Sequence, residues 1–187
     1  MLVYIIRHTK VEVLPGTCYG QSNVPLATSF PKELAHYKEQ LPTHFDQIYS
    51  SPLQRCQELA MALDNQTPIL EPALMEMNFG DWEGKTWDAI GQQESQPWME
   101  DFVNVAPPNG ENLADFFKRV HHFLEHLRLQ PYKQVLVVTH AGAIRCIWAF
   151  ATGMPLKNIF RIPVDYGEVL VLQLNPNPAE DRIIQKK

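Results

Sequence analysis

Two histidines each follow directly after a short apolar run of the sequence. His8 comes after Leu2–Ile6 and Arg7, and His140 comes after Gln134–Thr139. Both runs are typical of buried strands, and in open α/β sheets the ligand binds beyond the carboxyl ends of the strands. We therefore expect both imidazoles in one pocket, with Arg7 beside the first of them.

A second arginine, Arg55, lies in the first turn of the helix expected after the second strand, so it could reach the same sheet edge. Two arginines and two histidines make a site for a small, doubly charged anion, most naturally a phosphate monoester, because the planar guanidinium group binds phosphate oxygens in pairs. A neutral imidazole can also attack phosphorus and hold it as a phosphoamide, which divides hydrolysis into two steps.

The leaving alcohol of such a reaction needs a proton, and a carboxylic acid near the pocket could supply it. Glu76 is the best placed candidate on sequence grounds, and Asp81 and Glu83 in the same segment are its competitors. Taken alone, Arg55 could be an exposed helix charge and Glu76 a plain loop residue. The matching positions of the two histidines at strand ends favour a shared catalytic site.

Three other histidines lie close together in one expected helix: His121, His122 and His126. The i,i+4 pair could imitate a metal site, but no third, distant ligand can be identified, so we expect a solvated helix face. No metal and no cofactor are expected.

The elements that must position these residues alternate along the chain. Strands are expected over residues 2–6, 45–49, 134–139 and 168–174, and helices over 28–40, 53–63 and 109–129 and from 141 onward. Strands that alternate with helices predict an α/β layered fold with a largely parallel central sheet.

Residues 68–108 interrupt this alternation. The segment is rich in Pro and Gly and has weak periodicity, so it is predicted to be an irregular insertion with short helices near Trp87 and Trp98. Together with Trp82, these tryptophans are expected to form its small core. The 187 residues and the absence of a linker predict a single domain over residues 1–187.

Composition excludes several classes of protein. Hydrophobic residues make up 45% and charged residues 20% of the chain, the balance of a globular protein. The net charge of -5 offers no basic face for nucleic acid. The three cysteines have no metal-ligand spacing, and we recognise neither a signal peptide nor a membrane-spanning run. We therefore expect a cytoplasmic protein without a membrane partner.

Five ordered motifs between Met1 and about Leu174 resemble those of the histidine phosphatase superfamily, the phosphoglycerate-mutase-like proteins. They are Arg7-His8-Thr9, Ser50-Ser51-Pro52-Leu53-x-Arg55-Cys56, Leu74-x-Glu76-x-x-Phe79-Gly80-x-Trp82-Glu83-Gly84, Pro108-x-Gly110-Glu111 and Val138-Thr139-His140-Ala141-Gly142-x-Ile144-Arg145. The resemblance implies a three-layer α/β/α sandwich and a metal-independent phosphatase.

By this resemblance, His8 is the phosphorylated nucleophile and Glu76 is the proton donor. Arg7, Arg55 and His140 hold the phosphoryl group. The partner molecule is then a small phosphate ester, and the reaction passes through phosphohistidine without a cofactor.

The loop Gly16–Leu26 resembles that of the alpha-ribazole phosphatase group, which dephosphorylates alpha-ribazole 5'-phosphate in cobalamin biosynthesis. The residues expected to bind the substrate are Tyr19, Gly20, Gln21 and Ala141. Two rival functions are a phosphoglycerate-mutase-type phosphotransferase and a non-catalytic phosphate-binding module. A mutase would need extra covering segments, for which the chain leaves little room, and a binding module would need no proton donor.

The chain departs from the family pattern near the nucleophile. The usual Arg-His-Gly is Arg-His-Thr here, and the Asn with which many members contact the phosphate has no counterpart among Lys10–Leu14. Thr9 or Thr17 could take the place of that Asn.

Overall fold

A six-stranded sheet forms the centre of the computed structural model, which describes residues 1–186. Its strands are β1 (Leu2–Arg7), β2 (Gln47–Ser50), β3 (Ile69–Leu70), β4 (Gln134–Thr139), β5 (Val169–Gln173) and β6 (Arg182–Lys186). Their order is β3-β2-β4-β1-β5-β6. The first four pair in parallel, while the β1–β5 and β5–β6 pairs are antiparallel.

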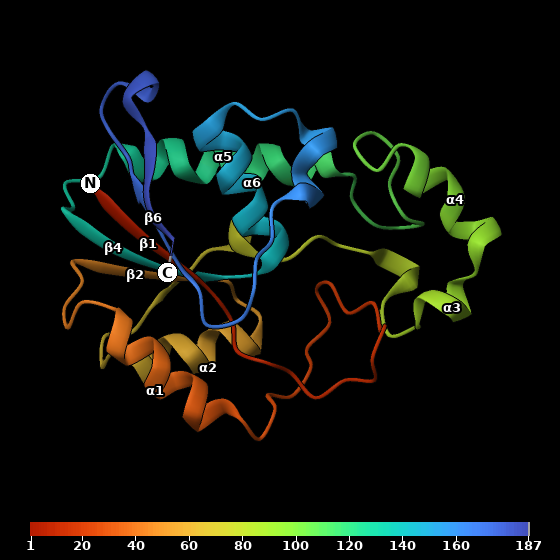
Figure 1. The fold of residues 1–187 in the computed structure, drawn as a ribbon, viewed down its shortest axis with the longest axis horizontal. Coiled ribbons are helices and arrows are strands. Elements are labelled where there is room, and N and C mark those ends of the chain that lie inside the picture. The colour runs from red at the N-terminus through yellow and green to blue at the C-terminus, as the bar shows by residue number, and fades with distance from the viewer. Residues whose placement is uncertain (187) are drawn as a thin grey trace.

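Helices cover both faces of this sheet (Figure 1). One face carries α1 (Phe30–Gln40) and α2 (Gln54–Leu63), and the other carries α5 (Leu113–Arg128) and α6 (Ala141–Thr152). The predicted three-layer α/β sandwich is therefore confirmed. Within residues 1–186, no helix is long and apolar enough to cross a membrane.

The central strands are buried on both faces, which explains their nearly continuous apolar sequence. Val135 and Val137 of β4 face the core shared with α5 and α6. Leu136 and Val138 face the core shared with α1 and α2. The sheet is thus a firmly packed frame for the residues that follow β1 and β4.

The long helix α5 begins later than the sequence predicts. The expected start at Asn109 is wrong, because Asn109 has a φ of 57° and the chain turns there. Asn112 caps the helix instead, and its side chain accepts a hydrogen bond of 2.8 Å from the backbone N–H of Asp115. Glu111 therefore lies outside the helix and can contact other segments.

The sheet extends beyond the predicted strands at both edges. The strand expected over residues 168–174 is present as β5, but the expectation that it is the last strand is wrong, since β6 follows and pairs with it. The sequence of β6 has two adjacent isoleucines between polar residues and no alternation, so it gives little sign of a strand. At the other edge, β3 has only two residues, which is too short for its alternation to be recognised.

The insertion contains the two helices expected near its tryptophans, α3 (Trp87–Ile90) and α4 (Gln92–Glu100). They lie at the far right of Figure 1, on the side toward which β1 and β4 run. The rings of Trp82, Trp87 and Trp98 have centroids 5.8–5.9 Å apart. The three tryptophans thus pack together, and Trp82 and Trp98 belong to the same core as the residues of α5 and α6 rather than to a separate small core.

Three short 3-10 turns connect the insertion and the later helices to the sheet: η1 (Pro72–Leu74), η2 (Gly80–Trp82) and η3 (Leu156–Arg161). A fourth, η4 (Pro178–Glu180), precedes β6. Between η1 and η2, residues 75–79 have no regular secondary structure. This irregular stretch carries Glu76.

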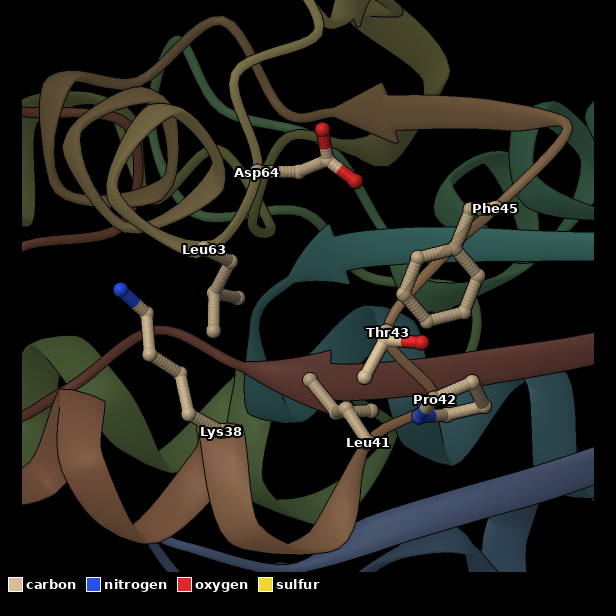
Figure 2. Close-up of a pocket in the computed structure, with 7 residues that line it drawn as sticks. All are labelled: Lys38, Leu41, Pro42, Thr43, Phe45, Leu63 and Asp64. Atoms are coloured by element: carbon tan, nitrogen blue, oxygen red, sulfur yellow. The ribbon is translucent and has the colours of Figure 1, made fainter.

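A cavity of about 280 Å³ lies between the carboxyl-terminal ends of α1 and α2 (Figure 2). Its walls are formed by Lys38, Leu41, Pro42, Thr43, Phe45, Leu63 and Asp64. Phe45 precedes β2, so this cavity is at the amino-terminal edge of the parallel strands, opposite to the edge where ligands of such sheets bind.

Candidate active site

The register of two neighbouring strands places the two candidate histidines together. Arg7 at the end of β1 pairs with Thr139 at the end of β4, and the backbone N–H of His8 donates to the carbonyl oxygen of Thr139 at 2.9 Å. His8 and His140 therefore leave the sheet side by side, with ring centroids 5.1 Å apart. The two histidines therefore converge beyond the carboxyl ends of β1 and β4, as expected.

His8 is held as a neutral ring with a defined tautomer. It is 2% exposed, and burial, followed by the positive charge of Arg55, holds the pKa of His8 well below its usual value. Its Nδ1 lies 2.7 Å from the carbonyl oxygen of Thr9. Because a carbonyl oxygen only accepts hydrogen bonds, Nδ1 carries the hydrogen and Nε2 keeps its lone pair.

His140 is fully buried beside a serine that had no assigned role in the sequence. Its Nε2 lies 2.8 Å from Oγ of Ser51 and 3.5 Å from Sγ of Cys56. Burial is the main cause that holds the pKa of His140 well below its usual value, and His8 and Arg55 add to it. Ser51 belongs to a family motif, but nothing in its residue type alone showed this contact.

Arg55 is buried in the first turn of α2 rather than exposed as a surface charge. It is 1% exposed, and its two terminal nitrogens donate to the carbonyl oxygens of Ser22 at 2.8 Å and Gly20 at 2.7 Å. Its Cζ lies 5.3 Å from the ring centroid of Tyr19. Its Nε is buried and has no hydrogen-bond partner within residues 1–186. The arginine thus ties the predicted substrate loop to the sheet edge.

Arg7 points to a residue that sequence reasoning missed. Nη1 donates to the carbonyl oxygen of Val164 and Nη2 to Oη of Tyr166, both at 3.0 Å. The guanidinium carbon lies 3.8 Å from the Tyr166 ring centroid, and that ring lies 5.9 Å from the ring of His8. In the sequence, Tyr166 is marked only as an aromatic residue in the polar turn just before β5, which does not show that it contacts Arg7.

The carboxylate of Glu76 lies at the amino-terminal end of α6, the helix that starts directly after His140. Oε2 accepts a hydrogen bond of 3.1 Å from the N–H of Gly142, and Oε1 accepts one of 2.9 Å from the N–H of Met77. A Cβ on Gly142 would lie 2.1 Å from Oε1, so this close approach requires glycine. Glu76 therefore reaches the same sheet edge as the histidines.

The two competing carboxylates are engaged elsewhere. Glu83 accepts hydrogen bonds from the backbone N–H groups of Gln21 at 2.8 Å, Ser22 at 2.6 Å and Phe79 at 3.1 Å, and from the Ser22 hydroxyl. It fastens the loop Gly16–Leu26 to the insertion. Asp81 is exposed and accepts a hydrogen bond of 3.0 Å from the side-chain amide of Asn109.

The predicted substrate-binding residues lie close to Arg55, Glu76 and His140. Gln21 donates from Nε2 to the carbonyl oxygen of Glu76 at 3.0 Å, and Ala141 is the first residue of α6. Thr9 is fully buried, and its hydroxyl has no hydrogen-bond partner in the described part of the chain. Thr17 instead forms a backbone bridge with Thr86 in the insertion.

A second, smaller cavity of about 100 Å³ lies beside Glu76. Its other walls are mainly apolar: Met77, Phe79, Leu113, Phe116, Gly142, Arg145, Ile159 and Phe160.

Within residues 1–186, no cluster of three or more His, Cys, Asp or Glu side chains could hold a metal ion. His121, His122 and His126 are all exposed on α5. Their location agrees with the expected solvated helix face.

The model of the histidine phosphatase superfamily (branch 1) matches residues 3–180. The chain belongs to this superfamily. The family predicted from the five motifs is therefore confirmed, and with it the class of phosphatase that acts on a small phosphate ester.

Relatives of this histidine phosphatase have several names. Adenosylcobalamin/alpha-ribazole phosphatase of Escherichia coli is 29% identical over 196 residues, covering 100% of this chain and 97% of the relative. Phosphoserine phosphatase 1 of Hydrogenobacter thermophilus is 27% identical, with 91% and 85% covered. A 2,3-bisphosphoglycerate-dependent phosphoglycerate mutase of Bartonella henselae is 32% identical, with 70% and 69% covered.

Among solved structures, the alpha-ribazole phosphatase from Shigella flexneri superimposes with a TM-score of 0.86 at 29% identity. The match covers 94% of this histidine phosphatase and 91% of that chain. Phosphatases that share the complete fold are thus similar to this chain in both sequence and structure.

Proposed function

We propose that this chain hydrolyses a small phosphate monoester through a phosphohistidine formed on Nε2 of His8. The convergence of a neutral, buried His8, a second histidine and two arginines at one sheet edge carries this proposal. The Thr9 carbonyl leaves the lone pair of the nucleophile on Nε2. Glu76 lies at the adjoining helix terminus, where it can serve the leaving group.

In the first step, Nε2 of His8 attacks phosphorus, and the bond between phosphorus and the ester oxygen breaks. The carboxyl group of Glu76 gives its proton to the departing oxygen, so an alcohol leaves. Arg7, Arg55 and His140 offset the charge on the phosphoryl oxygens, which shifts as the bonds change.

In the second step, the Glu76 carboxylate takes a proton from water while the water oxygen attacks phosphorus. The phosphorus–nitrogen bond breaks, and the products are inorganic phosphate and neutral His8. No metal takes part in this scheme, so exhaustive EDTA treatment should leave the rate unchanged. Restoration of a lost rate by Mg²⁺ or Zn²⁺ would contradict it.

The buried Thr9 hydroxyl supports a phosphate contact at the position where the family usually has glycine. A buried hydroxyl without a partner costs free energy unless a ligand supplies the missing bond. Thr9 is therefore proposed to replace the phosphate-contacting Asn that this chain lacks. Thr17 is less suited, because its segment pairs with the insertion.

The physiological substrate is proposed to be alpha-ribazole 5'-phosphate, in cobalamin biosynthesis. The loop that resembles this group is tied by Tyr19, Gly20 and Gln21 to Arg55 and Glu76. The apolar cavity beside Glu76 suits an ester whose leaving group carries an aromatic ring. Relatives with alpha-ribazole phosphatase names support the same choice.

The test is a panel of esters that contains alpha-ribazole 5'-phosphate, phosphoserine, sugar phosphates, 3-phosphoglycerate and nucleotides. We expect the highest kcat/KM for alpha-ribazole 5'-phosphate. A clear preference for phosphoserine would reassign the substrate and keep the mechanism. Binding of all these esters without phosphate release would favour the non-catalytic module.

A phosphoglycerate-mutase-type phosphotransferase is the second candidate, since a mutase relative is 32% identical. It would pass the phosphoryl group from phosphohistidine to a second phosphorylated substrate rather than to water. Isotope exchange between 2,3-bisphosphoglycerate and 3-phosphoglycerate separates the two functions. We expect phosphate release and no exchange.

A cytoplasmic location is also proposed, without a nucleic-acid or membrane partner. Cys18, Cys56 and Cys146 are buried free thiols, which suits a reducing compartment. The net charge of -5 disfavours binding to a phosphate backbone.

A further inference from the structure

Glu76 lies on a stretch that is not itself part of a strand or helix, yet its carboxylate must be placed accurately. Residues 75–79 have no regular secondary structure, so backbone carbonyls there need donors from elsewhere. Two of these donors, to the carbonyl oxygens of Met75 and Glu76, come from one side chain of α5, Arg119, which sequence reasoning did not single out.

Arg119 uses five N–H groups on five acceptors. Nη1 donates to the carbonyl oxygens of Ala73 at 2.7 Å and Met75 at 2.8 Å, and Nη2 donates to that of Glu76 at 2.9 Å. Nη2 and Nε also donate to the two carboxylate oxygens of Glu111, at 2.6 and 3.1 Å. A guanidinium group has five N–H donors in all, so its capacity is filled.

Glu111 fixes the far end of the same stretch. Its Oε1 accepts a hydrogen bond of 2.8 Å from the N–H of Asn78, and its own N–H donates to the Asn78 carbonyl at 2.9 Å. Arg119 also stacks on Phe116, with its Cζ 4.2 Å from the ring centroid. Phe116 lines the cavity beside Glu76. The Arg119–Glu111 pair thus holds the stretch on both sides of Glu76.

We propose that Arg119, braced by Glu111, is a positioning residue that sets the carboxyl group of Glu76 against the leaving oxygen. The inference rests on the proposed role of Glu76. A misplacement of about 1 Å can cost about 10²-fold in rate, so loss of these carbonyl contacts should weaken proton donation without removing the nucleophile.

The chain offers a matched control on the same helix. Arg128 also makes five hydrogen bonds, to Glu125, Asp181 and the carbonyl oxygen of Asn175. Its side chain is 5% exposed, against 23% for Arg119. Arg128→Met should therefore cost at least as much stability as Arg119→Met, but it should leave the chemistry intact.

The experiment measures the single-turnover burst of phosphoenzyme with an alkyl phosphate and with p-nitrophenyl phosphate, whose leaving group hardly needs a proton. Arg119→Met should lower the alkyl burst about 10²-fold and the p-nitrophenyl burst far less. Inhibition by inorganic phosphate should stay unchanged. Arg128→Met should show no contrast between the esters. Equal losses for both esters in Arg119→Met would overturn the inference.

Combination with Glu76→Gln tests whether the two residues act together. In that background, Arg119→Met should cause no further loss with the alkyl ester, because the group it positions can no longer donate. An additive loss would contradict the inference. If Glu76→Gln alone shows no contrast between the esters, the proposed role of Glu76 fails first.

A conservative variant keeps the test independent of folding. Arg119→Lys retains the charge but cannot reach five acceptors, so it should show the same contrast in a weaker form. If Arg119→Met does not fold, the contrast in Arg119→Lys decides the question. Wild-type bursts with both esters in Arg119→Lys would then overturn the inference.

Discussion

The two sides of the candidate site are built in different ways. On the phosphoryl side, His8 and His140 continue two paired strands of a sheet that is buried on both faces. On the proposed leaving-group side, Glu76 lies in an irregular stretch that side chains from α5 and from the loop Gly16–Leu26 hold in place. Backbone pairing positions the proposed nucleophile, whereas side-chain hydrogen bonds hold the stretch that carries the proposed proton donor.

This difference predicts which substitutions should affect each side of the site. Strand register cannot change without unpairing β1 and β4, so the phosphoryl side depends mainly on the reacting residues themselves. The position of Glu76 depends on side chains from distant parts of the sequence. Substitutions far from the reacting atoms can therefore displace its carboxyl group. The substitutions below test this contrast.

His8→Ala should have the largest effect. The variant loses the only proposed carrier of the covalent intermediate, and turnover should fall by about 10⁴-fold or more. Rapid-quench labelling should trap acid-labile phosphate on the wild type and none on the variant. The exposed His126 provides the control, since His126→Ala should label normally. Full activity in His8→Ala would end the phosphohistidine proposal.

Glu76→Gln keeps the shape of the side chain but cannot give up a proton. The loss in kcat should be about 10²–10⁴-fold with an alkyl phosphate. The burst with p-nitrophenyl phosphate should be impaired much less. The burst must be measured because, in the proposed mechanism, the same carboxylate also serves the water-attack step.

Asp81→Asn and Glu83→Gln separate Glu76 from its competitors. Asp81→Asn should leave both bursts unchanged, since Asp81 is exposed and contacts Asn109. Glu83→Gln should loosen the loop at Gln21 and Ser22 and raise KM for both esters alike. A leaving-group-dependent loss in either variant would move the proton donor to that residue.

Thr9→Val should weaken phosphate binding while the free protein stays as stable. The hydroxyl has no hydrogen-bond partner to lose among the described residues, so the melting temperature should not fall. A hydrogen bond to a charged group contributes about 1.5–3 kcal/mol, so the inhibition constant of inorganic phosphate should rise by about 10–100-fold. Unchanged inhibition would exclude Thr9 as a phosphate ligand.

Folding stability should depend on pH through the buried histidines. The pKa values of His8 and His140 are lowered in the fold from the usual 6.5, so the stability that they contribute is complete above pH 6.5. Below it, the unfolded chain binds protons that the folded chain does not, and stability falls by about 1.4 kcal/mol per pH unit for each histidine.

Urea unfolding of wild type and His8→Asn between pH 7.5 and 5.5 measures this effect. The wild type should lose stability more steeply below pH 6.5, by about 1.4 kcal/mol per pH unit. Parallel curves for the two proteins would show that His8 does not stay neutral in the fold.

Much of the fold could be predicted because its signals are local. The apolar runs that end at Arg7 and Thr139 correspond to β1 and β4, and the α2 face with Cys56, Leu59 and Ala60 is buried as expected. The start of α5 could not be predicted. Asn109 forms a turn with positive φ, and Asn112 caps the helix. From residue propensities alone, these two features cannot be distinguished from a helix that starts at Asn109.

Within the candidate site, sequence reasoning identified the residues that are proposed to carry the chemistry. It missed Tyr166, Ser51 and Arg119, which act on the site through contacts between segments far apart in the chain. Tyrosine, serine and arginine are common on surfaces and in loops, so their residue types alone give no signal.

The sequence by itself determined the family, the largely parallel sheet and the pair of histidines at two strand ends, whereas the structure showed that these strands are neighbours. Strand periodicity and motif order depend on residues that are close in the sequence, so they can be recognised without knowledge of the packing. Only the tertiary structure decided which carboxylate lies beside His140 and which side chains hold it there. Glu76, Asp81 and Glu83 are close in sequence, and only the long-range contacts to Gly142, Asn109 and Gln21 distinguish them.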